Sequence, residues 1–432
     1  MPSSPPIPHR ALLAGLLAAL TMLGPFCIDA IFPAFPAIAR QFGAGEVAMQ
    51  QTISVYLFAY AALSLFVGAM SDAWGRRTVI IGGLVLFLVG TIGCALAPSM
   101  HTLLMFRALQ GMCAGIGMIV GRAIVRDCFE GTHAQKLMAH ISMIFSIAPA
   151  LAPMFGAALV AWDGRPLASP PAGLVGWHAV FWALAVFTSV LIVLCLAVLP
   201  ETHARERRIA FLPSTLFANY RRIVTDRPFA ALALALTFNS AGFFLYIANA
   251  PALVLNILKL DQNHFPWLFV PAISGLTLGA LLTSRLAGRV SLRALVGSGY
   301  AVMLIASLLN LLIASTVQPA RIPWTVLPIG LGAIGVSLVA PALNLLVLDR
   351  FPQYRGAASS VQSFFMLICS ALLAGVLGPL IAVSALHLAV ASTVFYLLGL
   401  VGWSWYRAIA KRIPEKIDGD AAVVAATGAN PD

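Results

Sequence analysis

The stretch that decides the fold is Gly68-Ala69-Met70-Ser71-Asp72-Ala73-Trp74-Gly75-Arg76-Arg77. Roughly 20 apolar residues precede it and roughly 20 follow it, and each run is long enough to cross a bilayer as a helix. The segment between the runs is too short for a domain, so it predicts a tight turn between two membrane helices. Paired arginines at such a turn indicate the cytoplasmic side of a membrane.

The residue types in this turn suggest a gate. The Asp72 carboxylate can hold neighbouring helix ends through charge-assisted hydrogen bonds, and Gly68 and Gly75 allow backbones to approach closely. An ordinary positive-inside loop with an isolated acid is the alternative explanation. The pattern G-x-x-S-D-x-x-G-R-R, however, resembles the loop 2–3 signature of the major facilitator superfamily. The resemblance implies a transporter in which Gly68, Asp72, Gly75, Arg76 and Arg77 form a gating motif.

The composition indicates that the bilayer is the main solvent of the chain. Of 432 residues, 60% are hydrophobic and 9% are charged, whereas a soluble domain carries about 25% charged residues. The net charge of +11 lies largely in short loops between apolar runs, so it predicts membrane orientation and no nucleic-acid partner. The six cysteines are scattered without the spacing of a metal site or a disulfide framework. We expect no metal and no cofactor.

The apolar runs predict an all-α membrane protein with twelve transmembrane helices. The predicted spans are 11–39, 48–70, 78–97, 101–125, 137–161, 177–199, 228–257, 265–288, 292–314, 322–348, 356–383 and 386–409. Each is far too long for a barrel strand and lacks alternation. The loops predicted to be cytoplasmic hold nineteen Lys and Arg residues, against four on the opposite side: Arg40, Arg165, Lys259 and Arg321. Both termini should therefore be cytoplasmic.

The longest polar stretch lies at mid-chain and divides six spans from six. The expected organisation is a cytoplasmic N-terminus (1–10), an N-terminal six-helix bundle (11–199), a cytoplasmic linker (200–227), a C-terminal six-helix bundle (228–410) and a cytoplasmic tail (411–432). A weak repeat supports two related halves, because Leu286-Ala287-Gly288-Arg289 stands between spans 8 and 9 where Trp74-Gly75-Arg76-Arg77 stands between spans 2 and 3.

Asp29 and Arg107 are the charged residues that lie deepest in the predicted spans. Asp29 is ~27 Å along the first span and Arg107 is ~9 Å into the fourth, which runs the opposite way, so both lie in the outer half of the membrane. A charge at the bilayer centre costs about 2.5–3.5 kcal/mol and usually faces a cavity or a partner. Asp29 is the natural proton carrier, with Arg107 as its electrostatic partner. A permanent ion pair that only orients the helices is the alternative.

Other residues in the spans predict helix breaks and close packing. Pro33 and Pro36 follow Asp29, and proline removes backbone donors and kinks helices. In the fourth span, overlapping G-x-x-x-G pairs from Gly111 to Gly121 predict close helix packing. Arg122 lies near the cytoplasmic end of that span, where it is either functional or extended to the lipid headgroups.

The substrate cavity should be lined by aromatic rings and a few amides, which suits an apolar, uncharged ligand. Lipid-facing or packing aromatic residues are the alternative for any single ring. The candidates are Phe35, Phe238, Asn239, Phe243, Tyr246, Asn249 and Asn344.

Taken together, these residues resemble a drug:proton antiporter of the Bcr/CflA type within the major facilitator superfamily. The resemblance covers about residues 11–410 and includes Gly24 to Pro36, Phe106 to Gly111 and the helix 5 stretch from Ala148 to Ala157. That stretch resembles the antiporter motif G-P-x-x-G-G through Pro149, Pro153 and Gly156, but alanine replaces two glycines.

The resemblance implies the major facilitator fold, two halves that alternate around a cavity, and proton coupling through Asp29 and Arg107. It implies export of phenicol-, bicyclomycin- or sulfonamide-like drugs across a bacterial inner membrane by a monomer without enzymatic activity. A proton symporter that imports a small metabolite is the alternative within the same fold. A membrane enzyme or receptor is the alternative outside it, and the chain has no H-E-x-x-H, G-x-S-x-G or P-loop motif to support it.

Overall fold

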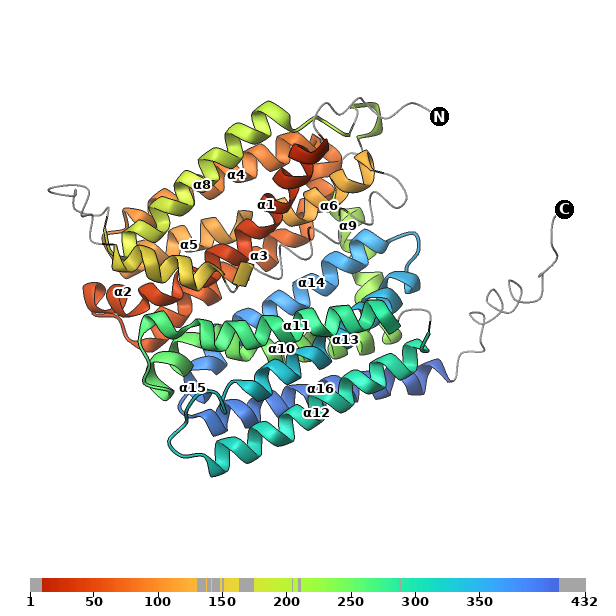
Figure 1. Ribbon diagram of the computed structural model, residues 1–432. Helices are drawn as coiled ribbons and strands as arrows, with labels where there is room; N and C mark the ends of the chain where they lie inside the picture. Colours follow the sequence, from red (N-terminus) through yellow and green to blue (C-terminus); the bar gives the residue numbers. More distant parts are fainter. Residues whose placement is uncertain are drawn as a thin grey trace.

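Helices in the computed structural model follow the apolar runs of the sequence (Figure 1). The structure describes residues 10–129, 137, 141, 148–149, 151–162, 175–203, 205–208, 211–286 and 289–411. Eleven helices in these ranges are long and apolar enough to cross a membrane. The predicted span 137–161 is described only in part, as a shorter apolar helix over Leu151–Ala161. The all-α prediction is therefore confirmed, and the other eleven predicted spans each correspond to one of the long helices.

The N-terminal half contains the helices drawn in red to yellow-green in Figure 1. They are α1 (Arg10–Asp29), η1 (Phe32–Ala34), α2 (Phe35–Phe42), α3 (Glu46–Trp74), α4 (Arg76–Ala95), α5 (Met100–Ala114), α6 (Ile116–Cys128) and α8 (Trp177–Val198). The first span breaks at Ala30 and Ile31, directly after Asp29. The break precedes Pro33, whose ring leaves the backbone one donor short, so the kink predicted from the prolines is confirmed.

The C-terminal half contains the helices drawn in green to blue. They are α10 (Arg227–Ala248), η3 (Ala252–Ile257), η4 (Gln262–His264), α11 (Pro266–Leu286), α12 (Leu292–Thr316), α13 (Leu327–Arg350), α14 (Arg355–Leu372), η5 (Leu373–Leu377), α15 (Gly378–Ile381) and α16 (Ala385–Ala410). The short helices α9 (Pro213–Val224) and η2 (Arg205–Arg207) lie between the halves in sequence. Asp226 begins α10 by accepting a hydrogen bond from the Phe229 N–H at 2.9 Å, which is the usual role of an acid before a helix.

We name the two ends of the molecule after two glycines with positive φ, as the Gly75 side and the Gly43 side. The Gly75 side holds the α3–α4 turn, the start of α1 and the end of α16, and the Gly43 side holds the α2–α3 turn. One buried apolar cluster fills the N-terminal half and continues into the C-terminal half through residues at the Gly43 side, such as Leu253 and Phe269. A second cluster, with Leu236 and Val339, fills the Gly75-side part of the C-terminal half. The two halves therefore share a continuous core at the Gly43 side.

Polar contacts between the halves also lie toward the Gly43 side. Ser54 of α3 donates a hydrogen bond to the Ala371 carbonyl oxygen of α14 at 2.7 Å. Asn256 of η3 donates to the Glu46 carboxylate at the start of α3, also at 2.7 Å. The Phe32 ring of η1 stacks on Phe269 of α11, with ring centroids 6.3 Å apart. This conformation is closed at the Gly43 side.

Glycines set the spacing of the helices around α5 and α6. A Cβ atom on Gly111 would collide with the backbone of Tyr56 in α3, and one on Gly117 would collide with the carbonyl oxygen of Leu20 in α1. Both positions hold neighbouring helices closer than any larger residue allows. The close packing predicted from the overlapping G-x-x-x-G pairs is confirmed.

The short helix α9 contacts both halves on the Gly75 side. The Tyr220 hydroxyl donates to the Leu65 carbonyl oxygen of α3, and the Phe217 ring packs edge-on against Phe66 of α3. Burial raises the pKa of Tyr220, so its hydroxyl keeps the proton that it donates. Arg222 lies over the Tyr354 ring beside α14, 5.8 Å from the centroid. α9 therefore connects α3 to the C-terminal half.

Candidate functional site

Gly75 forms the whole turn between α3 and α4. Its φ is +99°, a backbone conformation that a residue with a side chain rarely adopts. A Cβ atom there would also collide with the Glu201 carboxylate and the Arg208 guanidinium. These neighbours are side chains, so the close approach of backbones predicted at Gly75 stays a prediction. The close approach predicted at Gly68 is wrong for this conformation, because a Cβ atom on Gly68 would meet no atom within 4 Å.

Arg76 is the centre of a polar network at this turn. Its Nη1 lies 2.5 Å from the Asp72 carboxylate, one helical turn earlier, and 2.6 Å from the Ser71 hydroxyl. Its Nε lies 3.3 Å from Oδ2 of Asp127 at the end of α6. Its backbone N–H donates to the Glu201 carboxylate at 2.9 Å. The network thus joins the turn to the end of α6 and to the segment that follows α8.

Neighbouring residues extend this network. Thr202 donates a hydrogen bond to Oδ2 of Asp127 at 3.0 Å. Arg77 donates to the Leu196 carbonyl oxygen near the end of α8 at 2.7 Å. The sequence indicates Asp72, Arg76 and Arg77 because they stand together, but it gives no reason to connect Asp127 and Glu201 with them. Each acid stands near the end of an apolar run, and the stretch from Arg122 to Asp127 also resembles the antiporter group.

Arg107 lies fully buried among helices of the N-terminal half. Its Nη1 donates to Gln110 at 2.7 Å and to the Cys27 sulfur at 3.3 Å, and its Nε donates to the Thr52 carbonyl oxygen at 3.2 Å. The guanidinium also lies over the Tyr56 ring, 4.4 Å from the centroid. Nη2 has no hydrogen-bond partner among the described residues. These neighbours stabilise the cation by dipoles and a ring face instead of a carboxylate.

Asp29 is the last residue of α1, two residues after Cys27, and it is 4% exposed. The contact between Cys27 and Arg107 places this part of α1 at the depth of Arg107, as the helix arithmetic predicted. No described residue forms an ion pair with Asp29, and Arg107 uses other partners. The alternative of a permanent Asp29–Arg107 ion pair is therefore wrong for this conformation.

The motif of the fifth predicted span, formed by Pro149, Pro153 and Gly156, contacts α1 beside Asp29. A Cβ atom on Gly156 would collide with the carbonyl oxygen of Ala30, the residue that follows Asp29. The Phe155 ring packs against Phe26 of α1, with centroids 5.6 Å apart. Pro153 is buried, and Pro149 is half-buried. The motif therefore lies against the point at which the first span breaks.

Several residues predicted to line a substrate cavity pack within the C-terminal half. Asn239 donates to the Tyr300 hydroxyl at 2.9 Å, and the Tyr246 hydroxyl accepts from Asn310 at 2.6 Å. Asn249 donates to the Leu245 carbonyl oxygen in its own helix at 2.9 Å. In this conformation the amide nitrogens and this hydroxyl have protein partners, whereas Oδ1 of Asn239 and Oδ1 of Asn249 have none among the described residues. A role in substrate binding stays a prediction.

The aromatic candidates differ in exposure. Phe35 is buried at the Gly43 side against Phe32, and the half-buried Phe238 stacks on Phe395 of α16 at 6.0 Å. Phe243 is half-buried, and Asn344 is exposed. Arg122 is exposed as well. The set therefore does not form one contiguous lining in this conformation.

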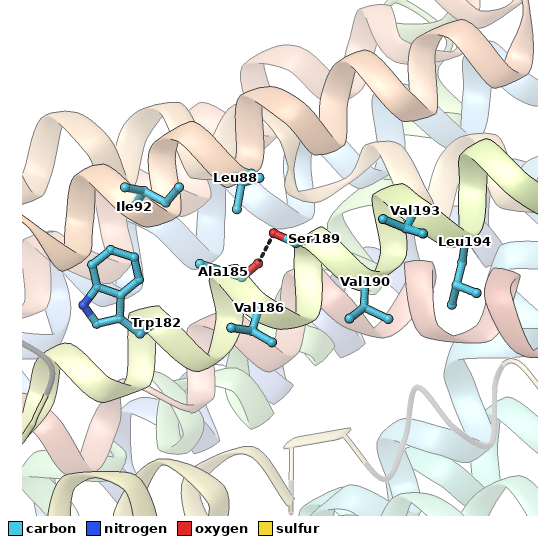
Figure 2. Close-up of a pocket in the computed structure, with 9 residues that line it drawn as sticks. All are labelled: Leu88, Ile92, Trp182, Ala185, Val186, Ser189, Val190, Val193 and Leu194. Atoms are coloured by element: carbon cyan, nitrogen blue, oxygen red, sulfur yellow. Dashed lines mark hydrogen bonds between the residues drawn. The ribbon is translucent and has the colours of Figure 1, made fainter. Parts of the chain in front are cut away.

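A shallow apolar groove of about 450 Å³ lies between α4 and α8 (Figure 2). Leu88 and Ile92 line it from α4, and the α8 side includes Trp182 and Val190. Ser189 has its hydroxyl bonded to the Ala185 carbonyl oxygen at 2.8 Å, which leaves the groove almost without free polar groups. The exposed residues Val85 and Val89 of α4 continue the apolar surface. This face of the N-terminal half suits contact with lipid chains.

The packed helical halves, the charges buried within spans and the polar network at the α3–α4 turn define a multi-pass membrane transporter. A model of the Major Facilitator Superfamily matches residues 16–374. The chain therefore belongs to the Major Facilitator Superfamily, which confirms the family predicted from the loop 2–3 motif.

Three relatives and one solved structure illustrate the similarity. The uncharacterized MFS-type transporter YdgK of Bacillus subtilis is 28% identical over 91% of this chain and 94% of its own length. A bicyclomycin resistance protein homolog of Haemophilus influenzae is 23% identical, covering 80% and 83%. The multidrug transporter MdfA of Escherichia coli is 26% identical, covering 79% and 80%. A bacterial homolog of the human lysosomal transporter Spinster, solved inward-facing and unoccupied, has a TM-score of 0.68 at 17% identity over 95% and 99%, which shows the shared fold.

Proposed function

We propose that this transporter exports small amphiphilic drugs across the bacterial inner membrane in exchange for protons. The relatives named for bicyclomycin resistance and multidrug transport support the substrate class. The observation that carries the proton coupling is the arrangement around the first span. Asp29 ends α1 at a break in the helix, beside a buried Arg107 whose Nη2 has no partner among the described residues. A buried acid and a permanently charged arginine that are not bonded to each other suit a cycle in which the acid changes its protonation and the two groups change their pairing.

The Gly75 side is the cytoplasmic side in this proposal. The loops at that side carry most of the Lys and Arg residues, and such an excess predicts the cytoplasmic face. Both termini are then cytoplasmic. The closed Gly43 side faces outward, so the conformation corresponds to the state that takes substrate from the cytoplasm or the inner leaflet. Proton entry from outside follows when the Gly43 side opens.

The decisive experiment uses everted membrane vesicles from cells that produce the protein. Respiration acidifies the vesicle lumen, and an antiporter then accumulates chloramphenicol inside as protons leave. We expect accumulation that stops when an uncoupler collapses the gradient. Vesicles with Asp29→Asn should lose this accumulation, while vesicles without the protein give the background.

The same vesicles separate export from import. A proton symporter runs in the direction of its protons, so an acidic lumen would drive its substrate out of everted vesicles instead of into them. Gradient-dependent loss of a preloaded metabolite, with no uptake of any drug tested, would replace the proposal by the symporter.

A further inference from the structure

Arg122 lies on the side of α6 that faces α3. Three contacts fix the orientation of α6: Gly117 packs on Leu20 of α1, Ile116 reaches Gly83 of α4, and Gly115, the residue directly before α6, abuts Tyr60 of α3. A helix turns ~100° per residue, so Arg122 projects ~140° away from Gly117 and ~120° away from Ile116, and within ~20° of Gly115. Arg122 therefore points away from α1 and from the apolar α4–α8 face.

α3 is the helix through which the N-terminal half meets the C-terminal half. It bonds to α14 through Ser54 and contacts α9 through Leu65 and Phe66. A side chain on the α3 side of α6 is thus directed toward the boundary between the halves. Arg122 is exposed there, on the Gly75-side part of its span, where the two halves have separate apolar cores.

Arg122 differs in exposure from the other charged residues that lie deep within the spans. Among the described spans, three charged residues lie more than five residues from either end of a span: Asp29, Arg107 and Arg122. Asp29 and Arg107 are buried, so Arg122 is the exposed member of this set. No described carboxylate lies within ion-pair distance of it. A guanidinium with no counter-ion among the described residues therefore lies toward the boundary between the halves on the Gly75 side.

We infer that Arg122 is a specificity-determining residue that binds an acidic group of the substrate, so the transporter prefers lipophilic organic anions over lipophilic cations. The inference rests on the proposed export function and names the substrate class for it. A guanidinium presents a planar fork of donors that matches carboxylate-like groups. A charge next to apolar helices of low dielectric attracts ions of the opposite sign and repels ions of its own sign.

The test compares fluorescein, an anion, with rhodamine 123, a cation that shares its xanthene ring system. Uptake of both dyes is measured in energised everted vesicles, together with chloramphenicol as the uncharged reference. We expect the wild-type protein to take up fluorescein at least about tenfold faster than rhodamine 123, the size of effect given by one charge-assisted hydrogen bond. Arg122→Gln should reduce this ratio by about the same factor, Arg122→Lys should retain most of it, and Arg122→Glu should favour the cation.

The matched control is Arg407→Gln, which removes an exposed arginine in the last turn of α16 on the same side of the molecule. It changes the net charge equally, so its dye ratio should equal that of wild type. An unchanged ratio in Arg122→Gln, in vesicles that still accumulate chloramphenicol, would overturn the inference and leave the proposed function intact.

If none of the three compounds is transported, the proposed function fails, and binding decides the inference separately. Fluorescence anisotropy of fluorescein with the purified protein should show about tenfold weaker binding to Arg122→Gln than to wild type. Equal binding to both proteins would overturn the inference.

Discussion

Nε of Arg76, the first residue of α4, lies 3.3 Å from Oδ2 of Asp127, the second-to-last residue of α6. The same Arg76 residue holds Glu201 through its backbone N–H. The α3–α4 turn is thereby joined to α6 and to the segment that leads toward the C-terminal half. This relationship makes the gating motif part of a network across the Gly75 side instead of an isolated loop.

Asp127→Asn should destabilise the conformation that is closed at the Gly43 side, because it removes one ion pair of this network. A partly exposed ion pair contributes about 0.2–1 kcal/mol, so the conformational equilibrium should shift by up to about fivefold. Spin labels at the exposed residues Val47 and Leu380, both at the Gly43 side, report the change as a larger population of long distances. Asp349→Asn is the control, because its pair with Arg355 is more than half exposed. Equal distributions in wild type and Asp127→Asn would refute the prediction.

Asp72→Asn should abolish transport while the protein still reaches the membrane. The substitution removes the charge that faces Arg76 Nη1 at 2.5 Å and leaves a neutral amide of the same size. Drug resistance of cells that carry the variant measures transport, and immunoblotting of membranes measures the amount of protein. Normal resistance at normal protein levels would contradict a gating role for Asp72.

Arg107→Lys should lower both thermal stability and transport, although the charge is retained. An ammonium group cannot reproduce the fork that reaches Gln110, Cys27 and the Thr52 carbonyl oxygen together. A buried acceptor left without its donor costs about 1–3 kcal/mol. Thermal unfolding in detergent measures the loss, with the exposed Arg40→Lys as control. The argument fails if the two variants unfold at the same temperature.

Asp29→Asn should fold normally but lose proton exchange. Asparagine mimics the protonated carboxyl group permanently, so proton binding can no longer alternate with substrate binding. Reconstituted vesicles that contain a pH-sensitive dye measure proton release when the drug is added, and size-exclusion chromatography monitors folding. Undiminished drug-driven release from Asp29→Asn vesicles would show that another residue carries the proton.

Gly156→Val should push the helix Leu151–Ala161 away from α1 and reduce both stability and transport. The added side chain would collide with the Ala30 carbonyl oxygen, which is backbone and cannot move aside cheaply. Overpacking of this kind costs about 1–3 kcal/mol. Gly297→Ala is the control, since a Cβ atom there meets no atom within 4 Å and alanine favours helix. Comparable melting temperatures of the two variants would rule out tight packing at Gly156.

The sequence predicts the helices well because the bilayer imposes their length and composition. Long apolar runs give the spans, and the prolines after Asp29 give the break in the first of them. The limits of the spans differ by a few residues. The helix of the tenth predicted span, α13, begins at Leu327 instead of at residue 322, because Pro323 lies in a turn before it. Such ends depend on local backbone geometry that composition does not encode.

The partners of the candidate site were less predictable, because they come from distant parts of the chain. Arg107 is easily found as a charge within an apolar run, but its contacts with Cys27 and Gln110 depend on how α1 and α5 pack. Asp29 lies near it without forming the ion pair that opposite charges suggest. Asn239 and Tyr246 stand out in the sequence as polar groups in an apolar span, and such groups also find partners inside a bundle. Helical periodicity alone does not distinguish polar side chains that line a substrate cavity from polar side chains that pair inside a bundle.

The aromatic contact at the Gly43 side bears on how much work each transport cycle requires. Phe32, Phe265 and Phe269 come from both halves and are fully buried. Exposing one such side chain to water costs about 1.5–3 kcal/mol, whereas one proton moving down a potential of 100 mV supplies about 2.3 kcal/mol. One proton at this potential therefore does not supply enough free energy to expose all three rings to water. As the outward gate opens, most of this aromatic surface must move onto other apolar side chains, lipid or the substrate itself.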